Sequence, residues 1–139
     1  MKNIILATHG NLSYEFKATA ELIVGSLPNI KCFGMTKDKS ATQGKKELES
    51  LIKSMDESNL IILTDMYGGS STNICTELLL SGHEFSLLTG LNLPMLLALV
   101  SGDSSDKSVS ELTSELEEAG ISGVINVGKK IKERIKNNA

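Results

Sequence analysis

Two short apolar runs limit what this chain can fold into. Residues 3–8 (NIILAT) and 60–64 (LIILT) are rich in isoleucine and leucine and show no alternation of apolar and polar side chains. A strand with one solvated face alternates, whereas a strand covered on both faces does not. The two runs therefore predict strands of a parallel sheet that lies between two layers of helices.

The rest of the chain alternates weaker strands with amphipathic helices. Further strands are expected at residues 31–35, 84–89 and 121–127, and helices at about residues 12–27, 45–55, 71–80, 94–100, 112–120 and 129–136. This order predicts an α/β three-layer sandwich, with a mainly parallel, doubly wound sheet and helices on both faces. The chain has no internal repeat and no linker, so residues 1–139 are expected to form a single domain.

The composition argues against several classes of protein: nucleic-acid-binding proteins, metalloproteins and membrane proteins. The 139 residues carry 14 basic and 17 acidic side chains and no Trp, so nucleic acid is not expected as a partner. Cys32 and Cys75 lie far from any zinc-ligand spacing; they are expected to be reduced, buried thiols, and no metal site is expected. The chain shows no signal-peptide pattern and no apolar run of membrane-spanning length, which predicts a cytoplasmic protein.

Polar loops follow three of the predicted strands, at residues 8–11, 65–70 and 90–92. The carboxyl ends of parallel strands meet at one edge of the sheet, where α/β proteins bind their ligands. His9 is the one side chain in these loops that titrates near neutrality and can act as a nucleophile or a base. Gly10 leaves space beside its ring. An ordinary turn histidine is the alternative interpretation.

Asp65 and the residues after it complete a candidate site. Asp65 ends an otherwise apolar strand; it either accepts a hydrogen bond from His9 and fixes its tautomer, or only caps the turn. Gly68, Gly69 and Ser70 precede a helix, a pattern typical of a phosphate cradle and also of an ordinary turn and N-cap. Together these residues predict a site that receives a phosphoryl group and passes it on.

A single arginine, Arg134, argues against several other phosphate chemistries. Histidine phosphatases begin with Arg-His-Gly, where this chain has Thr8-His9-Gly10, and neither cysteine begins the Cys-x5-Arg motif of a cysteine phosphatase. The segment Gly44-Lys45-Lys46 lacks both the first glycine and the hydroxyl of a P-loop. The other histidine, His83, is expected in a solvent-exposed turn at the opposite edge of the sheet.

Three segments carry a resemblance to a known family: residues 4–10 (IILATHG), 63–73 (LTDMYGGSSTN) and 89–96 (TGLNLPML). In this order and spacing they resemble the IIA domain of the mannose class of the bacterial sugar phosphotransferase system. The resemblance implies a phosphotransferase that takes a phosphoryl group from the phosphocarrier protein HPr and needs no cofactor. The group then passes to a histidine of a separate IIB protein, and the sugar is phosphorylated as the membrane components IIC and IID import it.

The resemblance also implies roles for individual residues. His9 would be phosphorylated on Nε2, and Asp65 would orient its ring. The residues implied to bind or border the phosphoryl group are Gly10, Gly68, Gly69, Ser70 and Asn92.

The family fold adds one antiparallel edge strand to the parallel sheet, and residues 121–127 are the candidate for it. C-terminal strands commonly join two subunits of this family, so a homodimer is implied. The sequence departs from the family in two places. Met66-Tyr67 stands where many relatives have Thr-Trp, and Ser71-Thr72 stands where proline and an apolar residue are common. Both departures affect the rim of the pocket and the choice of IIB partner.

Three other functions stay open on the sequence. The phosphocarrier subunit of a dihydroxyacetone kinase is related, but its motifs fit the Gly-Gly-Ser segment less well. A regulatory module would sense phosphorylation without serving a transporter. A small hydrolase would use Ser70, His9 and Asp65, but the chain lacks the Gly-x-Ser-x-Gly elbow of that class.

Overall fold

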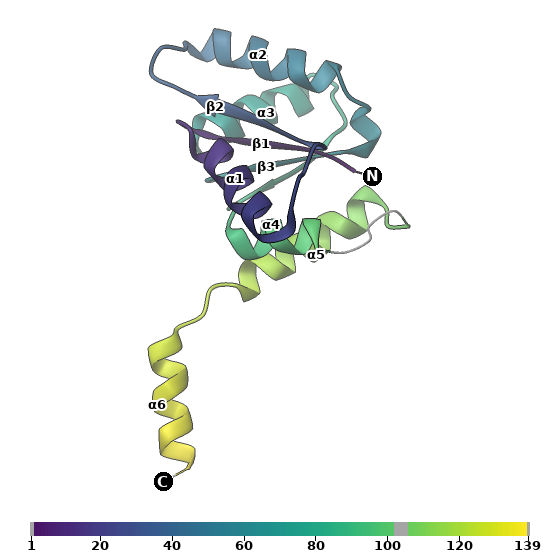
Figure 1. Ribbon diagram of the computed structural model, residues 1–139. Coiled ribbons are helices and arrows are strands. Elements are labelled where there is room, and N and C mark those ends of the chain that lie inside the picture. The colour runs from purple at the N-terminus through teal and green to yellow at the C-terminus, as the bar shows by residue number, and fades with distance from the viewer. Residues whose placement is uncertain (1, 102–105, 139) are drawn as a thin grey trace.

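A computed structural model describes residues 2–101 and 106–138 of the protein. Its strands are β1 (Asn3–His9), β2 (Ile30–Met35), β3 (Leu60–Thr64) and β4 (Ser86–Thr89). They form a four-stranded, all-parallel sheet in the order β2-β1-β3-β4 (Figure 1). Because the first strand lies between the second and the third, the chain order reverses beside β1. The carboxyl ends of β1 and β3 therefore border the crevice where such sheets bind ligands.

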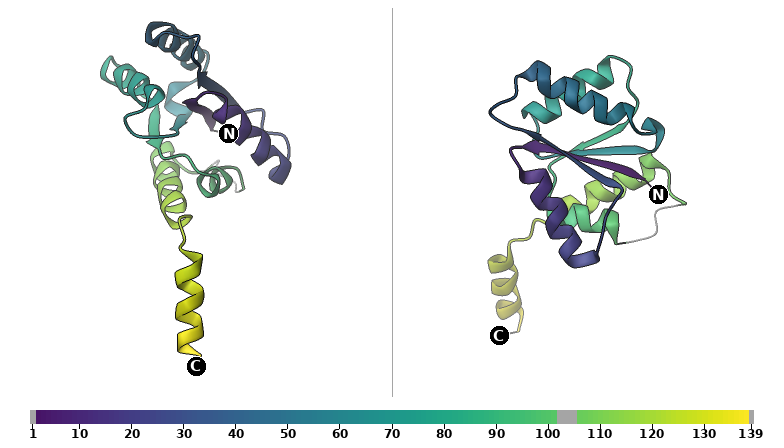
Figure 2. Two further views of the ribbon diagram at one scale, coloured as in Figure 1. Left: turned by 90° about the vertical axis from the view of Figure 1, so that its left-hand side faces the viewer. Right: turned by 45° about the horizontal axis from the view of Figure 1, so that its top comes forward.

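Helices cover both faces of the sheet. One layer holds α2 (Ala41–Lys53) and α3 (Ser70–Leu80), and the other holds α1 (Leu12–Val24), α4 (Leu93–Val100) and α5 (Val109–Ser122). The views from three directions agree on this three-layer arrangement (Figures 1 and 2). Among the described residues, no helix is long and apolar enough to cross a membrane.

Each face of the sheet has its own apolar core. Ile4 and Leu6 of β1 pack into the cluster that contains Leu96 and Leu116, while the alternate residues Ile5 and Ala7 pack into the cluster on the other face. The side chains of β3 are also buried along its whole length. The prediction that the two apolar runs form strands of a sheet covered on both faces is confirmed.

The C-terminal segment corrects the sequence analysis. Residues 121–127 do not form a strand: α5 continues to Ser122, and α6 (Val127–Asn137) begins where the strand was expected to end. The expected antiparallel edge strand is therefore missing from the described sheet. Tertiary contacts explain the longer helix, because the Gly120 carbonyl accepts a hydrogen bond from Asn92 and Gly123 packs closely against Pro94. α6 projects away from the other helices (Figures 1 and 2).

His83 also differs from its prediction. Its side chain is only 13% exposed, and it forms ion pairs through both ring nitrogens: Nδ1 lies 2.6 Å from Glu57 Oε1 and Nε2 lies 2.9 Å from Glu49 Oε2. Glu49 belongs to α2, and Glu57 begins the short helix η1 (Glu57–Asn59). The two hydrogen bonds raise the pKa of His83. The expectation of a solvent-exposed turn was wrong because both carboxylates come from distant parts of the chain.

Both cysteines are free, but only one is fully buried. Cys75 packs in the core between α3 and the sheet, where burial raises the pKa of its thiol to about 12. Cys32 is half-buried, and its Sγ lies 3.5 Å from the carbonyl oxygen of Ser13. No disulfide joins the two cysteines, and the prediction of burial holds in full for Cys75 alone.

Candidate functional site

The structure brings His9 and Asp65 together at the carboxyl edge of the sheet. His9 is the last residue of β1, and Asp65 follows directly after the neighbouring strand β3. One carboxylate oxygen, Asp65 Oδ2, lies 2.8 Å from His9 Nδ1 and also accepts the backbone N–H of His9 at 3.0 Å. Two parallel neighbouring strands that end side by side thus place the base and the carboxylate in direct contact.

This contact sets the protonation of the ring. A carboxylate only accepts hydrogen bonds, so Nδ1 of a neutral His9 carries the proton and Nε2 keeps its lone pair. The His9 side chain is 47% exposed, whereas that of Asp65 is 12% exposed. Burial raises the pKa of Asp65, but the hydrogen bonds from the His9 backbone and ring outweigh it, and the net pKa lies below its usual value. The site thus holds a mostly buried carboxylate behind a ring that is half-exposed to solvent.

The loop after Asp65 packs against the same ring. Gly69 is buried, and a Cβ atom added there would lie 2.7 Å from His9 Cε1, so only glycine leaves room for the imidazole. The Gly69 N–H donates to the Met66 carbonyl at 3.2 Å and closes a turn within the loop. It is therefore engaged inside the protein, and the next N–H groups along the chain belong to the first turn of α3. Gly68 has φ +82°, a conformation that favours glycine.

The first turn of α3 begins beside His9. Ser70 is the first residue of the helix and is exposed, so its hydroxyl is open to an anion. The first N–H groups of a helix have no partner within it, and such groups favour an anion at this end. Asn73 donates from Nδ2 to the Gly68 carbonyl at 3.2 Å and ties the loop to the helix. From the sequence, Asn73 is visible only as part of a motif, since spacing does not reveal which carbonyl a side chain reaches.

Asn92 is occupied elsewhere. It is the N-cap of α4, where its Oδ1 accepts the Met95 N–H at 2.9 Å. Its Nδ2 donates to the Gly120 carbonyl at 3.0 Å and joins α4 to α5. Both ends of the side-chain amide are thus bound to the scaffold, and the structure gives Asn92 a capping role.

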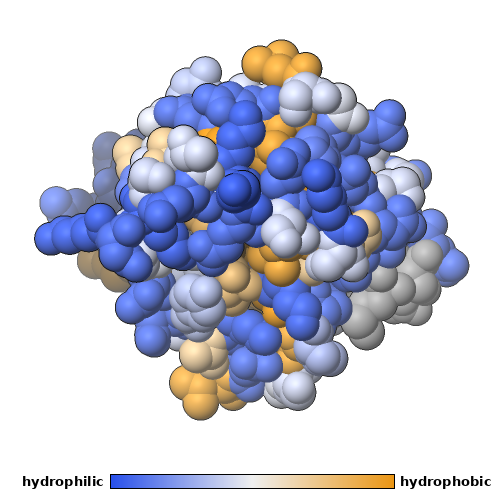
Figure 3. Space-filling view, turned by 90° about the horizontal axis from the view of Figure 1, so that it is seen from above, coloured by the Kyte–Doolittle hydropathy of each residue, from blue (hydrophilic) through white to orange (hydrophobic). Residues whose placement is uncertain are grey.

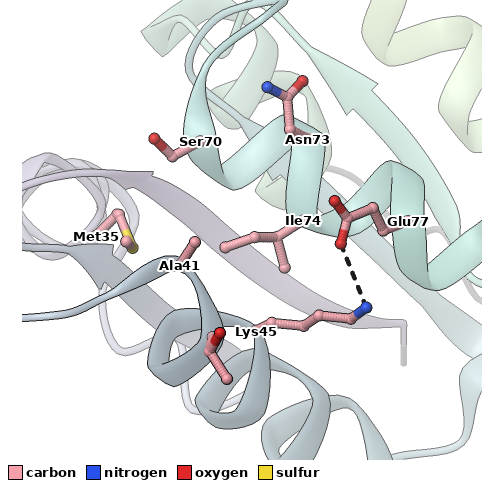
Figure 4. A pocket seen from close by; sticks show the side chains of 8 residues that line it. Met35, Ala41, Lys45, Ser70, Asn73, Ile74 and Glu77 are labelled. Atoms are coloured by element: carbon pink, nitrogen blue, oxygen red, sulfur yellow. Dashed lines mark ion pairs between the residues drawn. The ribbon is translucent and has the colours of Figure 1, made fainter.

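A cavity of about 600 Å³ opens between α2 and α3, beside the site (Figure 4). Met35 and Ile74 give it an apolar floor, Ser70 lines it on the side of α3, and Lys45 and Glu77 form an ion pair at 3.3 Å across it. Seen from the side of these two helices, the surface is mostly hydrophilic, with hydrophobic side chains visible in small patches (Figure 3). This mixed lining suits a protein partner better than an apolar small molecule.

Comparisons with known proteins agree on one family. A family model described as the fructose IIA component of the phosphotransferase system, EIIA-man, matches residues 3–117. The sorbose-specific EIIA component of Lacticaseibacillus casei is 31% identical over 81% of this chain and 81% of its own length. The mannose-specific EIIAB component of Escherichia coli K12 is 25% identical over 87% of this chain, which spans 38% of that longer protein.

Solved structures share the fold. An EIIA component from Streptococcus agalactiae superposes with a TM-score of 0.83 at 24% identity, covering 93% of this chain and 99% of its own. A mannose/sorbose-specific IIA subunit from Enterococcus faecalis has a TM-score of 0.81 at 28% identity, covering 91% and 95%. With the family model matching most of its length, the chain belongs to the mannose-class IIA family of the sugar phosphotransferase system.

Proposed function

We propose that this protein is a phosphocarrier in which His9 takes a phosphoryl group from HPr and passes it to a histidine of a IIB protein. Membership of the IIA family supports a phosphocarrier role in sugar uptake in general. The observation that carries the assignment to His9 is its geometry: Nδ1 is bound to Asp65 at 2.8 Å, and the ring is half-exposed beside the first turn of α3.

The transfer follows from this geometry. The lone pair of His9 Nε2 attacks the phosphorus atom of the donor phosphohistidine, the donor's phosphorus–nitrogen bond breaks, and its electron pair returns to the donor ring. Nδ1 keeps its proton, so the phosphorylated ring carries a positive charge that the Asp65 carboxylate offsets. The second transfer repeats the same steps with His9 as the donor.

The phosphoryl oxygens would be held mainly by backbone groups. The N–H groups at the start of α3 and the Ser70 hydroxyl lie on the loop that Gly68 and Gly69 shape, and Gly10 adopts φ +52° directly after the reactive histidine. We assign no phosphoryl contact to the Asn92 side chain, because both ends of its amide are bound to the scaffold. Such a cradle stabilises the group without a fixed cation, which suits a group that must leave again.

We also propose that the protein acts as a homodimer in the cytoplasm and serves the membrane components IIC and IID through its IIB partner. The C-terminal arm, residues 121–137, exposes Ile121, Val124, Ile125, Val127, Ile131 and Ile135. A second copy offers it the free edge of β4 and a cavity of about 300 Å³ lined by β4, α4 and α5. The charges match, because α6 is basic and the exposed face of α5 carries Glu111, Glu115, Glu117 and Glu118.

Light scattering of two matched variants tests the dimer. Ile131→Glu places a charge on the apolar stripe of α6 and is expected to give a monomer. Leu22→Glu changes an apolar side chain on α1 that is also exposed, outside the arm, and is expected to stay dimeric. A dimer that survives Ile131→Glu would argue against the arm as the interface.

Phosphorylation in vitro tests the carrier function. The protein is incubated with phosphoenolpyruvate, enzyme I and HPr, and mass spectrometry detects the addition of one acid-labile phosphoryl group. His9→Ala is expected to abolish labelling. His83→Gln is the matched control, since it removes the chain's other histidine at the opposite edge of the sheet and is expected to keep it.

The chase step separates the remaining alternatives. Transfer of the label to a IIB protein supports transport, whereas a label that no IIB accepts favours a regulatory module. A hydrolase would need Ser70 activated by His9, but among the described residues no hydrogen bond joins these two side chains. Wild-type protein that takes no label would refute the proposal.

A further inference from the structure

Three threonine hydroxyls meet beneath the loop that carries Asp65. Thr64 ends β3, Thr89 ends β4 opposite it in register, and Thr72 lies in the first turn of α3. Thr64 is fully buried, and Thr72 is 5% exposed. Thr72 Oγ1 lies 2.8 Å from Thr64 Oγ1 and 3.4 Å from Thr89 Oγ1.

The Thr72 hydroxyl also reaches the loop itself. It lies 2.7 Å from the carbonyl oxygen of Met66. A carbonyl only accepts, so Thr72 donates to Met66. It also donates toward Thr64 Oγ1, so the one Thr72 proton is shared between these two acceptors, and with Thr89 either hydroxyl can be the donor. The same Met66 oxygen accepts the Gly69 N–H at 3.2 Å. The turn therefore closes on an oxygen atom that the buried Thr72 hydroxyl holds in place.

This oxygen lies between the two groups that fix the His9 ring. Asp65 precedes Met66 and binds Nδ1, while Gly69, at the other end of the turn, packs against Cε1. If the Met66 carbonyl loses its shorter hydrogen bond, this oxygen keeps only the longer bond from Gly69. A valine at position 72 has the shape of threonine but no hydroxyl, so it would also leave the buried Thr64 hydroxyl without this partner.

We propose that Thr72 is a positioning residue for phosphoryl transfer, whose hydroxyl fixes the Met66 carbonyl and thereby the contacts of Asp65 and Gly69 with His9. The inference rests on the proposed transfer through His9. The Thr72 side chain is buried beneath the loop, and we assign its hydroxyl no phosphoryl contact. Its effect is to keep the ring in one orientation before the donor arrives.

Transfer kinetics with phospho-HPr test this role. Thr72→Val is expected to lower the rate at saturating phospho-HPr by about ten-fold, with an unchanged KM, since a displacement of about 1 Å costs about 10²-fold. Thr76→Val is the control on the same helix. The Thr76 hydroxyl donates to the Thr72 carbonyl at 2.8 Å within the helix, and its loss is expected to leave the rate unchanged. Nitrogen-15 NMR of His9 is expected to show a mixed tautomer in Thr72→Val alone.

A second pair of variants keeps the test valid if Thr72→Val folds poorly. Thr72→Ser and Thr72→Ala both lose the methyl group and differ only in the hydroxyl. Serine is expected to keep the rate within about two-fold, and alanine to lose it as valine does. Equal rates for the two, or a wild-type rate for Thr72→Val, would overturn the inference while leaving the carrier function intact. A wild-type protein that accepts no phosphoryl group would instead refute the proposed function.

Discussion

Gly69→Ala tests whether the fixed place of the His9 ring matters for transfer. Gly69 has φ −75° and ψ 162°, so alanine fits the backbone without strain, and the perturbation comes from the new methyl group alone. That methyl would lie 2.7 Å from His9 Cε1, and the ring must move by about 0.7 Å to reach the 3.4 Å of an ordinary contact. A shift of this size pulls Nδ1 out of line with Asp65.

The expected loss is kinetic. Because misplacement of a reacting group by 1 Å can cost about 10²-fold, Gly69→Ala should slow phosphorylation by phospho-HPr by about 10- to 100-fold. Stability should fall by about 1 kcal/mol, since glycine is a better N-cap than alanine by about this amount and the half-exposed ring can turn into solvent. Stopped-flow or quenched-flow labelling gives the rate, and urea unfolding gives the stability.

Gly128→Ala is the control, because its new methyl group meets only Asn126 Oδ1, at 3.7 Å. It should transfer at the wild-type rate. If Gly69→Ala also transfers at that rate, the ring needs no fixed position and the reasoning fails. A loss of several kcal/mol in Gly69→Ala would show that the damage spreads through the fold instead of staying at His9.

Three further predictions follow from the geometry. Ser71→Ala should raise the free energy of unfolding by about 1 kcal/mol, because this buried hydroxyl has no partner among the described residues. Ser13→Ala removes a hydrogen bond to the Phe33 carbonyl of β2 and should lower the free energy of unfolding by about 1 kcal/mol. Urea unfolding of the two variants checks that the changes have opposite signs. Gly34→Ala should cost about 3 kcal/mol or more by calorimetry, since its methyl would lie 2.2 Å from the Gly10 carbonyl oxygen. The raised pKa of His83 means that its stabilisation is complete below the unfolded pKa of about 6.5 and is lost as pH rises through the folded value. His83→Gln should therefore destabilise more at about pH 6 than at about pH 9 in thermal melts, and an equal loss at both would contradict the ion pairs.

The sequence predicted the central strands well because burial on both faces leaves a clear pattern. β3 has the predicted bounds of residues 60–64, and β1 is one residue longer than predicted. The start of β4 was harder to predict. The strand was expected to begin at residue 84 but begins at Ser86, and Phe85 is buried although it lies outside the strand. Strand ends depend on where hydrogen bonds to the neighbouring strand stop, and a single sequence does not contain that information.

Residues 121–127 show the opposite case. Their β-branched side chains favour a strand, but a strand also needs an edge to pair with, and propensity does not supply the edge. Within one described chain, contacts of Gly120 and Gly123 with α4 extend the helix instead. Tertiary packing decided the local structure here against the preference of the residues.

The candidate site was predictable where it depends on topology and not where it depends on the path of a loop. His9 and Asp65 end adjacent parallel strands, so the strand pattern was enough to bring them together. The roles of Gly69 and Thr72 depend on how the turn after Asp65 folds back onto Met66. No spacing rule distinguishes an amide that faces a ligand from one that closes a turn.

The two hydrogen bonds that Asp65 Oδ2 accepts explain how the site can stabilise a positive charge on the His9 ring. The oxygen accepts both the ring Nδ1 and the backbone N–H of His9, at 2.8 and 3.0 Å. The backbone bond belongs to the end of β1 and does not depend on the state of the ring, so the carboxylate stays in place when the ring is neutral, phosphorylated or displaced. The carboxylate can then stabilise a positively charged ring without moving, so the site is electrostatically preorganised and the reaction requires no reorganisation of the protein there. In the proposed relay the same carboxylate serves both transfers, and it stabilises the phosphorylated ring between them.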